Sequence, residues 1–77
     1  MITAEGFALL SHWAYADRIG ADVADPNGTL TVRLAEAGYL RPSAVHGMWR
    51  VTREGHAARS AYTRAHPVGE RVDGLPL

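Results

Sequence analysis

Ser11, His12 and Asp17 supply, within one short segment, the three side-chain types of a nucleophilic triad. Ser11 and His12 are neighbours on a predicted helix, so their side chains point about 100° apart and cannot pair as nucleophile and base. A chain of 77 residues is also too small for a deep catalytic pocket, because a domain of this size buries only about 60% of its unfolded surface. We therefore expect neither an enzyme nor a cofactor.

The histidines are the other candidates for chemistry. His46, His56 and His66 do not have metal-ligand spacing on a shared element, and no acidic partner accompanies them. The chain contains no cysteine, which excludes thiolate zinc sites and disulfides. The sequence therefore predicts no metal site and gives no reason to expect an oxidising compartment.

Charge is balanced over the whole chain but not along it. The chain has 8 Lys+Arg and 8 Asp+Glu. Residues 1–40 contain two arginines and five acidic residues, a balance of −3, whereas residues 41–66 contain five arginines and one acidic residue, a balance of +4. This asymmetry is typical of a protein whose one end meets an anionic partner, although an ordinary solvated surface would also account for it.

The same capping pattern predicts two helices. In Thr3-Ala4-Glu5-Gly6 and in Thr52-Arg53-Glu54-Gly55, a threonine can cap the first free amides and a glutamate lies in the first turn. We expect helices from about residue 4 to about Asp17, and from about residue 53 to the residue before Pro67. Their inward faces are predicted to be Phe7, Leu10, Trp13 and Ala14 in the first helix, and Ala58, Ala61, Tyr62 and Ala65 in the last.

Two structures compete for residues 19–37. In one, Asp25-Pro26-Asn27-Gly28 is a hairpin turn before a strand over Thr29–Leu34. In the other, a short helix over Ile19–Ala24 precedes a helix over Thr29–Ala37, with Leu30, Leu34 and Ala37 on its inner face. Residues 34–38 read Leu-Ala-Glu-Ala-Gly, which is typical of a helix C-terminus, so we favour the helix.

A two-stranded hairpin is predicted next. Residues 39–41 and 48–52 have the composition of short strands, with Leu40, Trp49 and Val51 as the expected buried set and residues 42–47 as the loop. Residues 67–77 contain prolines and glycines without an apolar period, so we expect a flexible tail after a single domain over residues 1–66.

The predicted order of elements resembles the winged-helix domain of PadR-like and MarR-like transcription regulators. The resemblance is carried by three segments, which are Gly28-Thr29-Leu30, Arg33-Leu34-Ala35-Glu36-Ala37-Gly38-Tyr39-Leu40, and Trp49-Arg50-Val51-Thr52-Arg53-Glu54-Gly55-His56-Ala57-Ala58. It implies an α+β winged helix with three N-terminal helices, a two-stranded wing and a C-terminal helix. It also implies a transcription regulator that binds double-stranded DNA and could form a homodimer. The expectation of a cytoplasmic location comes instead from the missing cysteines and from the absence of a long apolar run.

The expected DNA contacts follow from that resemblance. Thr29, Thr31 and Arg33 would enter or flank the major groove, and phosphates would be held by Arg41, His46, Arg50 and Arg53. No apolar run approaches the roughly 20 residues of a membrane span.

The alternative to a DNA-binding regulator is a winged-helix module that docks on a regulatory or host protein without binding DNA. This alternative is considered because Val32 and Ala35 lie on the predicted outward face and the net charge is zero.

Overall fold

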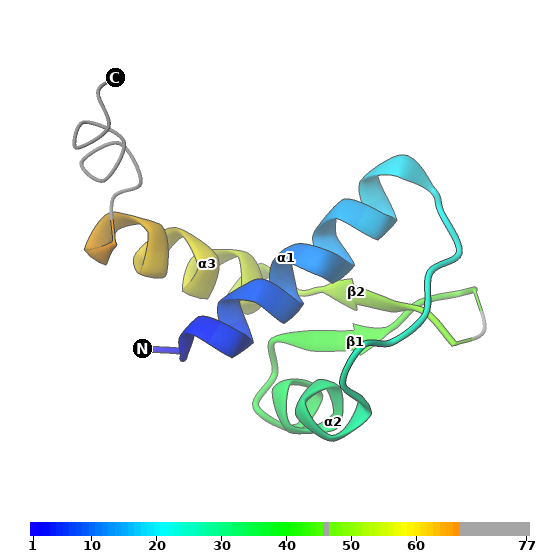
Figure 1. Ribbon diagram of the computed structural model, residues 1–77, viewed down its shortest axis with the longest axis horizontal. Helices are drawn as coiled ribbons and strands as arrows, with labels where there is room; N and C mark the ends of the chain where they lie inside the picture. The colour runs from blue at the N-terminus through cyan, green and yellow to red at the C-terminus, as the bar shows by residue number, and fades with distance from the viewer. Residues whose placement is uncertain (46, 67–77) are drawn as a thin grey trace.

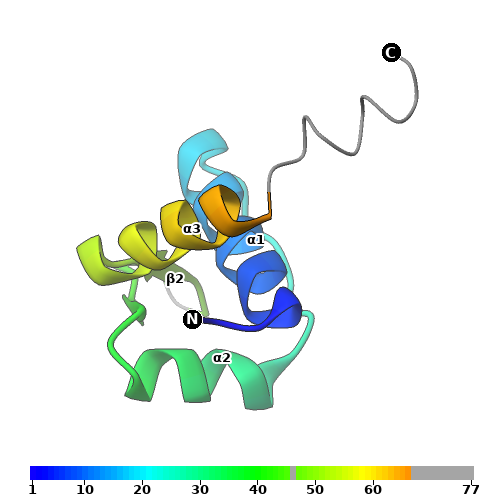
Figure 2. The same ribbon diagram turned by 90° about the vertical axis from the view of Figure 1, so that its left-hand side faces the viewer.

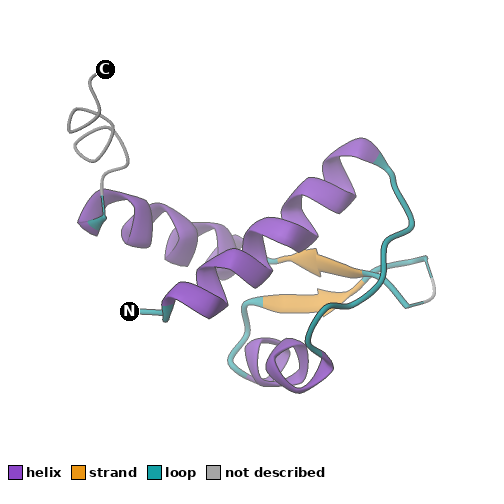
Figure 3. Cartoon of the chain, in the orientation of Figure 1, coloured by secondary structure: helices purple, strands orange, loops and turns teal. Residues whose placement is uncertain are grey.

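The computed structural model describes residues 1–45 and 47–66. Within them the chain has an α+β fold, with three helices and one two-stranded antiparallel sheet (Figures 1 and 3). The elements in chain order are α1 (Ala4–Ile19), α2 (Gly28–Glu36), β1 (Leu40–Pro42), β2 (Trp49–Val51) and α3 (Arg53–Ala65). α1 is central, because it contacts α2, α3 and β2. The predicted tail over residues 67–77 lies outside the described residues.

Both predicted threonine caps are present. Thr3 Oγ1 accepts a hydrogen bond from the Gly6 amide at 3.0 Å, and Thr52 Oγ1 accepts one from the Gly55 amide at 3.0 Å. The predicted starts of α1 and α3 are therefore confirmed. α1 continues two residues past the predicted end, until Gly20 adopts the left-handed conformation at φ 69° and its amide bonds back to the last turn.

The helical interpretation of residues 29–37 is confirmed with slightly different ends. Asn27 caps α2, with its side-chain oxygen accepting from the Leu30 amide at 3.1 Å, and Gly38 follows the helix at φ 90°. The predicted short helix over Ile19–Ala24 is wrong, because Ile19 ends α1 and no helix forms between α1 and α2. The few residues between Gly20 and Pro26 are too short to nucleate a helix, and proline disfavours the helical conformation in the residue before it. Two helices, not three, therefore precede the hairpin.

The predicted hairpin forms, although its strands of three residues each differ from the predicted bounds. Of the expected buried set, Leu40 is buried, whereas Trp49 and Val51 are half-buried and Met48 is buried in their place. β1 pairs with β2 in the register Leu40↔Val51, Arg41↔Arg50 and Pro42↔Trp49. Backbone hydrogen bonds continue the ladder at both ends, from the Thr52 amide to the Tyr39 carbonyl and from the Ser43 amide to the Met48 carbonyl, each at 3.0 Å.

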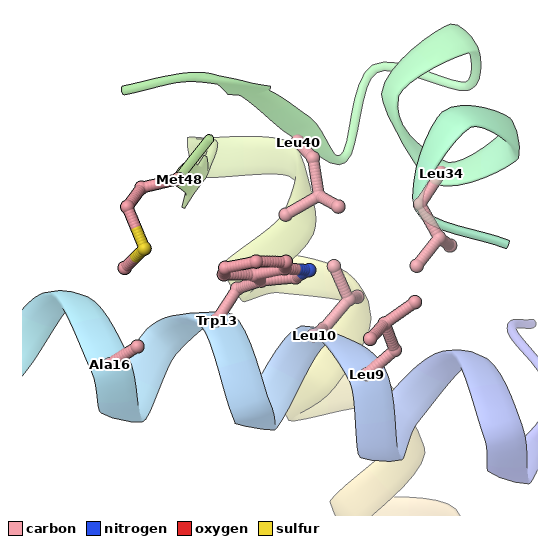
Figure 4. Packing of buried hydrophobic residues seen from close by; sticks show 7 residues of the cluster. All are labelled: Leu9, Leu10, Trp13, Ala16, Leu34, Leu40 and Met48. Carbon is pink, nitrogen blue, oxygen red and sulfur yellow. The ribbon is translucent and has the colours of Figure 1, made fainter. Parts of the chain in front are cut away.

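The core is small and centres on Trp13. Figure 4 shows the indole ring between α1 and the hairpin, with Met48 toward one end and Leu34 toward the other. The predicted inward stripe of α1 is partly confirmed, because Leu10 and Trp13 are buried but Phe7 and Ala14 are only half-buried. The buried hydrophobic residues are Leu9, Leu10, Trp13, Ala16, Leu34, Leu40 and Met48.

α3 adds little to this core. Gly55 is its buried residue, Ala58 packs against the core from its edge, and Ala65 is exposed. The predicted inward face of α3 is thus partly confirmed, because Ala58 packs within the domain but Ala65 does not. None of the helices described here is long and apolar enough to cross a membrane.

Candidate nucleic-acid interface

Thr31 is buried, so it cannot make the predicted contact with a DNA base. Its side chain is only 1% exposed, and its hydroxyl accepts from Trp13 Nε1 at 3.3 Å and donates to Asp25 Oδ1 at 2.9 Å. Thr31 lies one turn before Leu34, so the two share the inward face of α2. The predicted inner face of Leu30, Leu34 and Ala37 is thereby corrected, since Ala37 is exposed. Thr31 orients α2 against α1 and is not accessible to DNA.

The two other predicted residues of α2 are exposed but have acidic neighbours. Thr29 and Arg33 line a shallow hollow together with Glu5 of α1. Glu36 is exposed one turn after Arg33, and Val32 on the outer side of α2 is 50% exposed. The outward surface of α2 therefore carries one cation among carboxylates and an apolar side chain, which is a poor surface for phosphate.

The hairpin brings predicted cations together. Arg41 and Arg50 are register partners, so their side chains leave the same side of the two-stranded sheet, and both are exposed. Arg53 is exposed at the first position of α3, three residues after Arg50. Like charges placed directly opposite each other repel, and an anion bound between them relieves that repulsion. His46, predicted to act with them, lies outside the described residues.

One carboxylate offsets part of this charge. Arg50 Nη2 lies 3.5 Å from Asp17 Oδ2 of α1, and the two side chains are 49% and 43% exposed. This is the one ion pair within residues 1–45 and 47–66. An ion pair this exposed contributes no more than about 1 kcal/mol, so Arg50 is free to exchange Asp17 for a phosphate at small cost.

Further polar residues gather on α3, where the sequence prediction named only Arg53. A shallow hollow is lined by His56, Arg59, Ser60, Thr63 and Arg64. Arg59 donates from Nε to Ser11 Oγ and from Nη1 to His56 Nδ1, each at 3.4 Å. Because arginine can only donate, the second bond requires the neutral His56 tautomer with its proton on Nε2. The signal that could have identified this surface is the helical spacing of the basic residues.

Ser11 and His12 have separate partners. Ser11 accepts from Arg59, as above, whereas His12 Nε2 lies 3.1 Å from the Ala24 carbonyl oxygen. That contact requires a proton on Nε2, so His12 serves to hold the chain between α1 and α2. The two side chains thus act on different parts of the fold.

An apolar hollow lies at the C-terminal end of α1. It is lined by apolar side chains of α1, of the segment after it and of the hairpin, together with Asp17 and Asp22. Its apolar lining consists of Ala16, Ala21, Val45, Met48 and Trp49. Val45 is 56% exposed, and the nearby α1 residue Ile19 is 50% exposed.

Comparison with known proteins returned no match among family models, curated proteins or solved structures. The resemblance to PadR-like and MarR-like regulators therefore stays a prediction, carried by the segments over residues 28–58. Any functional conclusion depends on where the fold places the charged side chains.

Proposed function

We propose that this chain is a small DNA-binding protein of winged-helix-like layout that acts as a transcriptional regulator. The observation that carries the proposal is the exposure of Arg41, Arg50 and Arg53 on the hairpin and at the adjoining start of α3. Guanidinium groups match phosphate oxygens with paired hydrogen bonds and stay charged at every physiological pH. The α+β order, with a helix on either side of a two-stranded hairpin, is compatible with a winged helix that has one N-terminal helix fewer than predicted.

Binding of this kind is dominated by the phosphate backbone. Reading bases in the major groove requires donors and acceptors such as Arg, Asn or Gln, and α2 offers Arg33 and Thr29 on its outer side. The burial of Thr31 removes one of the three base contacts that the resemblance implies. We therefore expect modest sequence selectivity and an affinity that falls steeply with salt.

A salt titration tests this function. Fluorescence anisotropy with a labelled duplex of about 20 base pairs should show binding at about 50 mM salt and a loss of about 40-fold or more at about 200 mM. That loss corresponds to three neutralised phosphates, each contributing about −0.9 to the slope of log affinity against log salt. Arg50→Ala should make the slope shallower by about 0.9 and weaken binding to every sequence alike.

Arg18→Ala is the matched control, because it removes the same charge from the exposed end of α1, where Arg18 lies over the Tyr15 ring. Its slope should equal that of the unsubstituted protein. Absence of binding at about 50 mM salt, or binding that ignores salt, would overturn the proposed function.

Asp17→Asn is expected to strengthen DNA binding about two- to fivefold at about 100 mM salt. The substitution removes the carboxylate that competes with phosphate for Arg50, and one full phosphate contact corresponds to about eightfold at that salt. Stability should change by less than about 0.5 kcal/mol, because both partners are well exposed. Anisotropy measures the affinity and urea denaturation the stability.

Asp22→Asn is the matched control for Asp17→Asn. It makes the same change in net charge on an exposed residue that has no arginine within ion-pair distance among the described residues. An equal gain in both variants would show that net charge, and not release of Arg50, controls the affinity.

The apolar hollow favours a second candidate function, a protein-interaction module without DNA binding. An apolar side chain could occupy the hollow, and a neighbouring basic residue of the partner could meet Asp17 and Asp22 in its lining. Such a module would ignore duplex DNA at about 50 mM salt. Val45→Asp would abolish its protein contact and leave DNA binding, if any, unchanged.

A further inference from the structure

We propose that DNA lies along the outer face of α3, and not along α2, so that the helix after the hairpin is the main DNA-contacting helix. This inference depends on the proposed function and specifies which surface performs it. We call that surface the basic face of α3, and it consists of Arg53, His56, Arg59, Ser60, Thr63 and Arg64.

Helix geometry places these six residues together. Successive residues turn by about 100°, so the set falls within an arc of about 140° on α3. Glu54, the one acidic residue among residues 53–65, lies outside that arc. Every side chain of the basic face can donate a hydrogen bond, and none carries negative charge.

The charge of this face is not offset by nearby carboxylates. In the described part of the chain, no Asp or Glu oxygen lies within ion-pair distance of Arg53, Arg59 or Arg64. Arg53 and Arg64 are exposed, whereas Arg59 is half-buried and held by Ser11 and His56. Arg33 of α2, in contrast, shares its hollow with Glu5. The electrostatic preference of a polyanion is therefore for α3.

The length of the face matches a groove of duplex DNA. Arg53 and Arg64 are 11 positions apart, which corresponds to about 16 Å along a helix that rises about 1.5 Å per residue. The major groove of B-DNA is about 12 Å wide. Arginines at the two ends can therefore reach phosphates on opposite sides of the groove, while His56, Ser60 and Thr63 lie above its floor.

The arrangement of the helices separates the two candidate surfaces. Figure 2 shows α3 crossing α1 with α2 set apart below them, and α1 contacts both helices. A duplex on the outer face of α3 is thus held without α2. This agrees with the burial of Thr31 and with the carboxylates beside Arg33.

A basic amphipathic helix can also bind an anionic membrane, but the apolar side of α3 is already used. Tyr62 stacks on Phe7 of α1 with 4.5 Å between ring centroids, and Ala58 packs against the core. Binding in the membrane interface requires a free apolar face that enters the lipid. The structure therefore favours a nucleic acid as the anionic partner.

Two double variants compare the contributions of α3 and α2 to duplex binding. Arg53→Ala/Arg64→Ala should reduce the salt slope by about 1.8 and weaken duplex binding about 60-fold at about 100 mM salt, because two phosphate contacts are lost. Thr29→Ala/Arg33→Ala should weaken binding by less than about twofold and leave the salt slope unchanged, because the inference gives α2 no phosphate contact. Arg18→Ala again controls for the loss of a single positive charge, and thermal unfolding verifies that each variant is folded.

The possible results test the assignment of DNA contacts to α3 separately from the proposed DNA binding. A loss of about eightfold or more in the α2 pair, or an unchanged salt slope in the α3 pair, would overturn the assignment to α3 and would leave the proposed DNA binding intact. No binding to duplex DNA by the unsubstituted chain would overturn both. Sedimentation with phosphatidylserine vesicles should recover no protein, and arginine-dependent recovery without DNA binding would identify lipid as the partner and overturn the inference.

Discussion

Gly55→Ala is expected to lower the free energy of unfolding by about 3 kcal/mol, the upper end of the usual effect of overpacking. Gly55 is buried in the first turn of α3, and an added Cβ would overlap the Tyr39 carbonyl oxygen and lie 2.6 Å from Val51 Cγ1. The Tyr39 carbonyl already accepts the Thr52 amide at 3.0 Å, so backbone must move. α3 would separate from the hairpin, which would also weaken the proposed DNA binding. Urea denaturation followed by circular dichroism measures the effect.

Gly28→Ala is the matched control for that substitution. Gly28 begins α2, and a Cβ there would meet only Asp25 Oδ2 at an ordinary 3.8 Å. Its stability should stay unchanged or rise by about 0.4 to 1 kcal/mol, because alanine reduces the freedom of the unfolded chain. Equal unfolding midpoints for the two variants would show that α3 does not sit this closely against Tyr39.

Trp13→Ala is expected to lower the free energy of unfolding by about 4 kcal/mol. The indole is fully buried at 0% exposure, and it fills the space between α1 and the hairpin around which the other core side chains pack (Figure 4). A domain of this length has a total stability of roughly 4 to 11 kcal/mol, so this variant would be near the limit of folding. Near-ultraviolet circular dichroism and urea denaturation measure the loss.

Thr31→Val tests how much the hydrogen bond of Trp13 contributes to stability, apart from the contribution of Trp13 packing. Valine retains most of the volume but leaves the buried Trp13 Nε1 without its acceptor, Thr31 Oγ1, and leaves Asp25 without the hydroxyl donor. We expect a loss of about 1 to 3 kcal/mol, smaller than that of Trp13→Ala. An unchanged stability would mean that this polar chain does not help to hold α2 on α1.

The exposure of the basic residues was predictable from the sequence, but their grouping was not. Arg33, Arg41, Arg50 and Arg53 are exposed as a basic interface requires, because arginine is seldom buried without a partner. Their grouping depends on strand register, which places Arg41 opposite Arg50, and on the direction in which α3 leaves the hairpin. The ion pair between Arg50 and Asp17 joins residues 33 positions apart, and no spacing along the chain indicates it.

The sequence by itself determined where α1 and α3 begin and that residues 40–51 form a hairpin. Thr3 and Thr52 cap the amides of residues three positions later, and such contacts depend only on local chain geometry. Only the tertiary structure decided which side of each element faces inward. Thr31 is polar and was expected outside, yet Trp13, 18 positions earlier, supplies the hydrogen bond that makes its burial favourable. Residues this far apart in the chain come together through tertiary packing, and the local sequence pattern does not encode that packing.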